Sequence, residues 1–189
     1  MEVSKLTILR AALSYEPKKL NLDVSMVPAG VMVLIYIASS EYHVVLNKRS
    51  NSVGDHKGEV SFPGGTMETG DGTLLQTALR ETYEELGVLP EDVKILGELD
   101  DVLTSTNYMV RPFVGAISKG YKFVRNPREV EEIIDVPAKN IFHEDAFRHE
   151  VMIVNGVPRS APCYVYAGKV IWGATAKILH NLNRLVLNF

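Results

Sequence analysis

The sequence predicts an α+β fold in which helices pack on a central mixed β-sheet. Apolar runs of strand length recur along the chain from residue 29, and segments 73–86 and 171–187 space their apolar residues at helical intervals. Because the strands come in runs instead of alternating strictly with helices, the pattern favours α+β over a doubly wound parallel sheet.

The chain has 189 residues, which suits one domain with attached elements. No internal repeat, low-complexity tract or Gly/Ser linker marks a boundary. We therefore expect a single domain over residues 1–189, with residues 1–28 as an N-terminal helical extension. Within this extension the apolar spacing predicts a helix at 3–14, which Pro17 keeps from continuing far.

The predicted strands are short apolar segments bounded by turn residues. The strands predicted at 29–38 and 42–48 form a hairpin around a turn at residues 39–41. The segment Pro63-Gly64-Gly65 ends the strand predicted at 59–62. An amphipathic helix at 171–187 closes the chain. The strands are expected at 29–38, 42–48, 59–62, 93–99, 109–118, 130–136 and 164–166.

Composition excludes several classes of function. Twenty basic residues oppose 23 acidic ones, and this even balance excludes binding of duplex nucleic acid by bulk positive charge. The single cysteine, Cys163, excludes an internal disulfide framework and a Cys-based zinc site. The longest apolar run, 29–38, is far shorter than the ~20 residues that span a bilayer. We expect a cytoplasmic protein whose partner is neither nucleic acid nor membrane.

The helix predicted at 73–86 has unusually crowded charges. Thr73 and Gln76 stand at capping-box spacing, and Gly87 follows as a C-terminal stop. Near its end lies the run Arg-Glu-x-x-Glu-Glu, whose carboxylates fall on one face and in the half where the helix dipole disfavours anions. A divalent cation would relieve this repulsion. The residues of this run are Arg80, Glu81, Glu84 and Glu85. Without further evidence, such a run more often forms a solvated acidic helix face than a metal site.

The glycines before this helix favour a ligand site. Gly64-Gly65 and Gly70-Asp71-Gly72 allow close approach of the backbone to a metal or phosphate. The spacing Gly65-x4-Gly70 begins like a phosphate-binding P-loop, but Asp71-Gly72 stands where Lys-Ser/Thr should follow. No Gly-x-Gly-x-x-Gly follows a strand, so nucleotide binding of the P-loop or Rossmann kind is unsupported.

Together these segments resemble the Nudix box, whose usual form is Gly-x5-Glu-x7-Arg-Glu-apolar-x-Glu-Glu-x-Gly-apolar. Here Asp71 replaces the first Glu, one extra residue precedes Arg80, and Thr82 occupies the apolar position. The resemblance implies the Nudix fold, a mixed central β-sheet sandwiched between helices. It also implies a pyrophosphatase that uses Mg²⁺ or Mn²⁺ to hydrolyse a nucleotide-diphosphate small molecule.

The sequence is further similar to the coenzyme A pyrophosphatase subfamily. That subfamily shares the one-residue extension and the signature Leu-x-x-Arg-Ser-x3-Arg-x-His-x-Gly-x3-Phe-Pro-Gly-Gly. Gly54 replaces the second Arg of this signature. The implied reaction cleaves coenzyme A or acyl-CoA to 3′,5′-ADP and (acyl-)4′-phosphopantetheine. The matching positions are Leu46, Arg49, Ser50, His56, Gly58 and 62–65.

The resemblance implies roles for individual residues. Arg80 is expected to orient a glutamate through a bidentate pair. Glu129 is a candidate base or metal ligand, although a plain surface glutamate beside Arg128 is an equal alternative, and Glu132 is the substitute. The implied catalytic residues are Arg80, Glu81, Glu84, Glu85 and Glu129; the metal ligands are Gly64, Glu81, Glu84 and Glu85; the substrate-binding residues are Arg49, Ser50, His56, Lys57 and Gly65.

Two alternatives remain at this level. Another nucleoside diphosphate derivative, such as ADP-ribose or a dinucleoside polyphosphate, could be the substrate. A non-catalytic nucleotide-binding module is a second alternative, but such modules usually lose box glutamates, and Glu81, Glu84 and Glu85 are all present. A homodimer is also compatible with the sequence, because the apolar face of the closing helix can pack on its own sheet or on a second subunit.

Overall fold

A long hairpin forms the centre of the sheet. In the computed structural model, which describes residues 2–21, 23, 25–50, 58–154 and 156–187, β1 (Val27–Ala38) pairs antiparallel with β2 (Glu41–Arg49). Ser39 and Ser40 both have positive φ, as the two central residues of a tight hairpin turn require. β1 also pairs in parallel with β7 (Tyr108–Ala116), so the sheet is mixed, as predicted.

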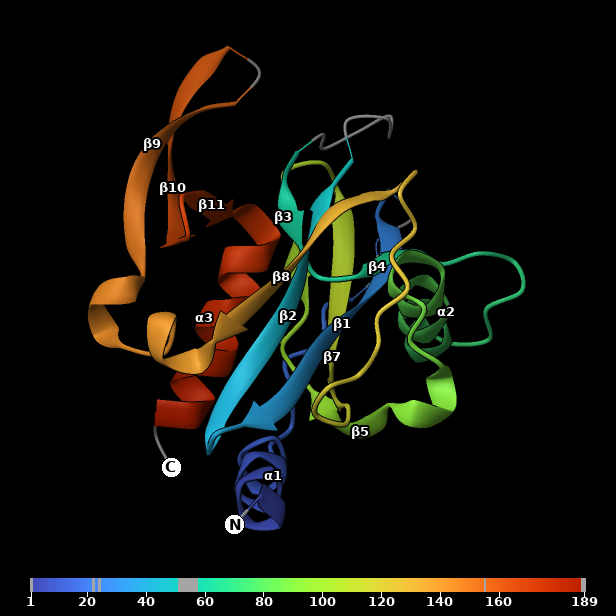
Figure 1. The fold of residues 1–189 in the computed structure, drawn as a ribbon. Coiled ribbons are helices and arrows are strands. Elements are labelled where there is room, and N and C mark those ends of the chain that lie inside the picture. Colours follow the sequence, from blue (N-terminus) through green and yellow to red (C-terminus); the bar gives the residue numbers. More distant parts are fainter. Residues whose placement is uncertain (1, 22, 24, 51–57, 155, 188–189) are drawn as a thin grey trace.

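Two sheets are described. The larger has the strand order β3-β2-β1-β7-β5, with β4 added to β1, β6 to β7 and β8 to β2 (Figure 1). The smaller has the order β11-β10-β9. The remaining bounds are β3 (Val60–Ser61), β4 (Gly64–Thr66), β5 (Lys94–Glu98), β6 (Val102–Leu103), β8 (Val130–Pro137), β9 (Arg148–Val154), β10 (Val157–Tyr166) and β11 (Lys169–Trp172).

Helices cover both faces of the larger sheet. α2 (Leu74–Leu86) lies on one face, and α1 (Glu2–Ala12) and α3 (Gly173–Leu187) pack on the other (Figure 1). Successive residues of β1 point to opposite faces, so Met32 and Leu34 pack with α2, whereas Val33 and Ile35 pack with α1 and α3. The apolar face of α3 is therefore buried on its own sheet. Short 3₁₀ turns lie at Pro90–Asp92, Ala138–Asn140 and Glu144–Ala146.

Three sequence predictions are corrected by the structure. The closing helix begins at Gly173 and not at residue 171, because Ile171 and Trp172 belong to β11. The segment Pro63-Gly64-Gly65 does not simply end a strand, since β4 follows at once and pairs with β1. Of the smaller sheet, only the end of β10 was predicted.

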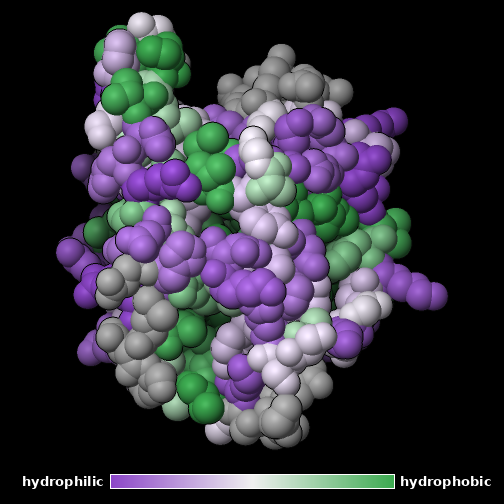
Figure 2. Space-filling model, turned by 60° about the vertical axis from the view of Figure 1, so that its left-hand side comes forward, coloured by the Kyte–Doolittle hydropathy of each residue, from purple (hydrophilic) through white to green (hydrophobic). Residues whose placement is uncertain are grey.

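Strand β9 and strand β10, of which only the end was predicted, form an arm that projects from the body (Figure 1). Pro158 and Pro162 lie within β10, and proline weakens any strand signal. Exposed apolar side chains, Val151, Ile153 and Val157, lie on this arm, and Figure 2 shows apolar atoms gathered there. Among the residues that the structure describes, no helix is both long and apolar enough to cross a membrane.

Gly30 sets the distance between α2 and the sheet. A Cβ at this position would collide with the backbone carbonyl of Leu74 and lie 3.2 Å from the amide nitrogen of Ala78. Both of these atoms belong to the α2 backbone and cannot swing aside as a side chain could. The first two turns of α2 can therefore lie directly on β1 only because residue 30 has no side chain.

We expect Gly30→Ala to lower the free energy of unfolding by about 3 kcal/mol, the upper end for overpacking, because backbone must move. Gly70→Ala is the matched control, since a Cβ there meets nothing within 4 Å. Its effect should stay within about 1 kcal/mol. Urea unfolding of both variants measures the difference, and equal stabilities would contradict this account of the packing.

Candidate active site

The α2 helix has well-defined ends. Thr73 is the N-cap, and its Oγ1 accepts a hydrogen bond from the Gln76 backbone N–H at 3.2 Å, as the capping-box spacing predicted. Gly87 ends the helix in the left-handed conformation, with φ 67°. A Cβ on Gly87 would lie 2.7 Å from that of Val124, whose backbone N–H donates to the Leu86 carbonyl at 2.9 Å. The helix end therefore also docks a later segment of the chain.

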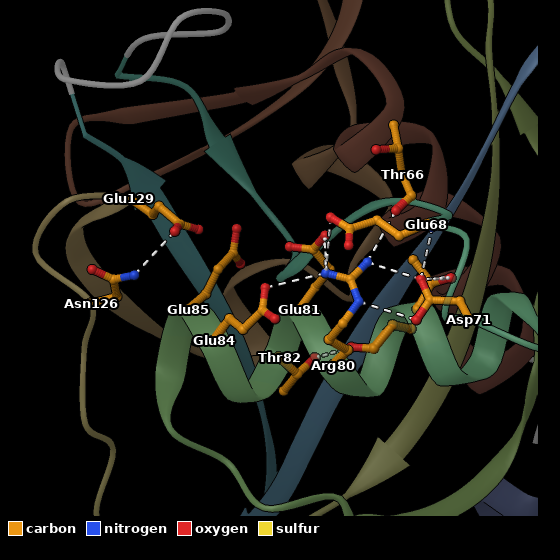
Figure 3. Close-up of polar contacts among 12 residues, drawn as sticks. Thr66, Glu68, Asp71, Arg80, Glu81, Thr82, Glu84, Glu85, Asn126 and Glu129 are labelled. Carbon is orange, nitrogen blue, oxygen red and sulfur yellow. Dashed lines mark hydrogen bonds and ion pairs between the residues drawn. The ribbon is translucent and has the colours of Figure 1, made fainter.

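Three carboxylates converge beside this helix end. Glu81 and Glu85 come from α2, and Glu129 immediately precedes β8. One carboxylate oxygen from each lies within 4.8 Å of the others. Figure 3 shows Glu129 facing the side of α2 that carries the glutamates. The structure thus brings together two predicted box residues and the predicted later glutamate.

Backbone hydrogen bonds fix Glu129 from two sides. The Asn126 N–H donates to the Glu85 carbonyl at 2.9 Å, which ties this segment to α2. The Ser50 N–H donates to the Glu129 carbonyl at 2.8 Å, which ties it to the end of β2. The Asn126 side chain then donates to Glu129 Oε1 at 3.1 Å. Glu132, the substitute candidate, instead pairs with Lys169 at 3.1 Å.

Glu85 is the most deeply buried of the three carboxylates, with 2% of its surface exposed. Its Oε2 accepts a hydrogen bond from Asn47 Nδ2 at 2.7 Å, and its Oε1 lies 3.8 Å from the Arg49 guanidinium. Burial raises the pKa of Glu85 to about 8, and the charges of Glu81 and Glu129 add to the rise, while Arg49 and Asn47 oppose it. These two partners therefore do not compensate the converging charges.

Glu81 lies against the glycines of β4. A Cβ on Gly65 would collide with the Glu81 carboxylate, so only glycine admits the carboxylate at this point. Burial raises the pKa of Glu81, Arg80 opposes this, and the charges of Glu84 and Glu129 add to the rise. Gly64 lies next to Gly65 on β4, opposite Val31 of β1.

Arg80 joins α2 to the loop that precedes it. Its Nε and one terminal nitrogen bind the two carboxylate oxygens of Asp71 at 3.1 and 2.9 Å. The bidentate partner is therefore Asp71 and not a glutamate, which corrects the sequence expectation. The other terminal nitrogen donates to Glu81 Oε1 at 2.9 Å and Glu84 Oε2 at 3.2 Å (Figure 3). Hydrogen bonds from Arg80 hold the pKa of Asp71 well below its usual range.

Of the other predicted site residues, some lie beside the three converging carboxylates and others do not. The side chain of Glu84 is 46% exposed, and Glu84 is not one of the three converging residues. Arg49 and Ser50 lie at the end of β2, beside Glu85 and Glu129 respectively. His56 and Lys57 fall outside the described residues. Sequence reasoning gave no role to Asn47 or Asn126, although an Asn that follows the apolar run 44–46 was a usable signal for the first of them.

This arrangement fits a hard divalent cation. Such ions prefer carboxylate oxygens, and the cluster offers three glutamates from two separate segments. Burial raises the pKa values of Glu81 and Glu85, and the neighbouring carboxylates add to the rise, so their ionised forms are disfavoured without a counter-charge. When like-charged carboxylates are crowded and partly buried in this way, a cation is the natural counter-charge.

Known proteins match the chain at the levels of family and fold. The model of the family described as NUDIX domain matches residues 26–153. An uncharacterized Nudix hydrolase, NudL, of Photorhabdus laumondii is 32% identical over 157 residues, covering 83% of this chain and 84% of the relative. NudL of Pectobacterium atrosepticum, also uncharacterized, is 33% identical over 141 residues, covering 74% of this chain and 72% of the relative.

Two solved structures share the fold at low sequence identity. An Ap4A hydrolase from C. elegans aligns with a TM-score of 0.57 and 15% identity, over 87% of this chain and 100% of that chain. The Nudix hydrolase RenU from M. smegmatis aligns with a TM-score of 0.58 and 16% identity, over 86% of each chain. The domain match, the relatives above 30% identity and the shared fold agree that this chain belongs to the Nudix hydrolase family of pyrophosphatases, which act on phosphoanhydrides.

Proposed function

We propose that Glu81, Glu85 and Glu129 hold the divalent cation, Mg²⁺ or Mn²⁺, that the reaction requires. Their convergence within 4.8 Å is the observation that supports this most directly. Glu84 and the Gly64 carbonyl remain predicted ligands that could complete the coordination. When bound, such a cation neutralises charge on a diphosphate and promotes attack by water.

The chain's own side chains supply the remaining roles. Glu129 is our candidate proton acceptor for the attacking water, or a further ligand, with one oxygen held by Asn126. Arg49, whose guanidinium lies at the margin of the acidic cluster, is suited to contact a phosphate oxygen of the substrate. Arg80 is a positioning residue, because its donors are engaged by Asp71, Glu81 and neighbouring groups.

We propose coenzyme A or acyl-CoA as the substrate. Water adds across one P–O–P linkage, so that the products are 3′,5′-ADP and (acyl-)4′-phosphopantetheine. The support is the upstream signature, because Arg49 and Ser50 stand beside Glu85 and Glu129 as phosphate-binding residues should. His56, Lys57 and Gly65 complete the proposed substrate-binding set. The retained box glutamates favour an enzyme over a non-catalytic nucleotide-binding module.

Two proposals concern the context in which the enzyme acts. The substrate is a small molecule, and we expect the protein to work in the cytoplasm. A homodimer stays a prediction, although α3 already buries its apolar face within its own chain. Size-exclusion chromatography with light scattering would decide this last point.

We expect the metal-free protein to lose stability as pH rises, through Glu85. The unfolded carboxyl ionises near 4.5, whereas the folded one keeps its proton to about 8, so folding is favoured fully below 4.5 and progressively less above it. Glu85→Gln removes this titration. Its free energy of unfolding in EDTA, relative to wild type, should rise by about 1 kcal/mol per pH unit between about pH 5 and pH 8.

Glu84→Gln is the matched control, since Glu84 is a neighbouring helix glutamate with an exposed side chain. Its stability relative to wild type should change little over the same pH range. Chemical unfolding followed by circular dichroism provides the measurement. If the difference in free energy of unfolding between Glu85→Gln and wild type does not change with pH, Glu85 does not have the raised pKa on which this prediction rests.

We expect coenzyme A or an acyl-CoA to be the fastest substrate in a panel that includes ADP-ribose and a dinucleoside polyphosphate. Reactions with Mg²⁺ and with Mn²⁺ are followed by mass spectrometry of the products. Glu85→Gln should lower kcat by about 1,000-fold, because a ligand of the proposed cation is lost. Much faster cleavage of ADP-ribose would contradict the coenzyme A assignment. Binding without cleavage of any compound would favour the non-catalytic alternative.

A further inference from the structure

Asn47 is a fully buried amide in β2. None of its surface is exposed, and it follows the buried apolar residues 44–46. A buried amide is costly unless its donors and acceptor are satisfied. Asn47 makes two short side-chain hydrogen bonds: Nδ2 donates to Glu85 Oε2 at 2.7 Å, and Oδ1 accepts from Ser61 Oγ at 2.7 Å.

These bonds form a chain across three elements. Ser61 lies on β3 as the register partner of Asn47 on β2, and Glu85 lies on α2. Nδ2 faces the Glu85 carboxylate, and the Ser61 hydroxyl, which can either donate or accept, donates to Oδ1 on the other side. The opposite orientation would place Oδ1 against an oxygen of the ionised Glu85 carboxylate, so that two acceptors would meet. The chain therefore selects one orientation of the amide and presents a donor to Glu85.

The result is an asymmetric Glu85 carboxylate. Oε2 is bound by Asn47 at 2.7 Å, whereas Oε1 faces the Arg49 guanidinium at 3.8 Å, beyond hydrogen-bonding distance. We propose that Asn47 and Ser61 are positioning residues that hold Glu85 by one oxygen, so that its other oxygen stays available to the divalent cation. This inference rests on the metal site proposed above.

Glu85 needs the hydrogen bond from Asn47 because its carboxylate is buried. A carboxylate taken out of water must regain hydrogen bonds from the protein, and a charge-assisted bond from a buried amide is among the stronger replacements. Without it, Glu85 would be free to turn toward Arg49, the other polar partner described beside it. Groups that hydrogen-bond to a metal ligand without contacting the metal typically contribute about 10–100-fold to metal affinity.

The test compares Mn²⁺ affinity without substrate, measured by electron paramagnetic resonance of free Mn²⁺. Asn47→Leu should weaken Mn²⁺ binding by about 10–100-fold, because leucine has a shape similar to that of asparagine but no hydrogen-bonding groups. Ser61→Ala should weaken it by about 3-fold or more, since Asn47 then loses the partner that orients it. Ser61→Thr keeps the hydroxyl and should restore the affinity. Circular dichroism in EDTA checks that each variant is folded.

A double-mutant comparison separates positioning from general damage to the fold. In a Glu85→Gln background, Asn47→Leu should change Mn²⁺ affinity by less than about 2-fold, because its effect acts through the Glu85 carboxylate. An equal loss in both backgrounds would overturn the proposal. So would folded Asn47→Leu and Ser61→Ala proteins with wild-type affinity, or a wild-type protein that binds no Mn²⁺.

The outcomes are separable from those of the proposed function. If Asn47→Leu does not fold, the Ser61→Ala and Ser61→Thr pair still decides, since Ser61 is only partly buried. If the affinities change as expected but no coenzyme A derivative is cleaved, the positioning role stands and the substrate proposal fails. If the substrate is cleaved but the variants bind Mn²⁺ normally, the reverse conclusion holds.

Discussion

The crowding of Glu81, Glu85 and Glu129 is the constraint on which the rest of the site depends. Their oxygens lie within 4.8 Å of one another, and burial raises the pKa of both helix glutamates. Such an arrangement is unfavourable to folding, so the surrounding structure must hold it in place. Asn47 from β2 and the backbone of Asn126 contribute to this, and each connects α2 to a different segment of the chain.

The glycines, which have no side chain, are as important to the site as the charged residues. Gly30 lets the α2 backbone lie on β1, and Gly65 lets the Glu81 carboxylate lie against β4. Gly87 both ends α2 and admits Val124, whose segment leads to Glu129. The glycines therefore act before any ligand binds, because they bring backbone and carboxylates close enough to form the cluster.

Local signals explain what could be predicted from the sequence. The caps of α2, Thr73 and Gly87, lie within the segment they terminate, and the hairpin strands have continuous apolar runs. Glu129 could be proposed only from family resemblance, because its position depends on hydrogen bonds to Ser50 and α2. The contact between Asn47 and Glu85 joins residues 38 apart, and no local pattern encodes it. Strand β9 and the first part of β10 were missed because the apolar side chains of this arm are exposed and β10 contains two prolines.

Arg80 lies beside the cluster of glutamates, but most of its hydrogen bonds hold the preceding loop to α2. Its guanidinium binds both oxygens of Asp71, its other hydrogen bonds go to Glu81, Glu84 and the Thr66 carbonyl, and Glu68 lies at 3.8 Å as an ion pair. Its positive charge is therefore largely used in holding the loop to α2. Burial raises the pKa of Glu85, and the charges of Glu81 and Glu129 add to the rise, so a cation bound by the cluster would favour the ionised form. The Asp71–Arg80 pair thus gives the site rigidity while leaving its negative charge available to a metal ion.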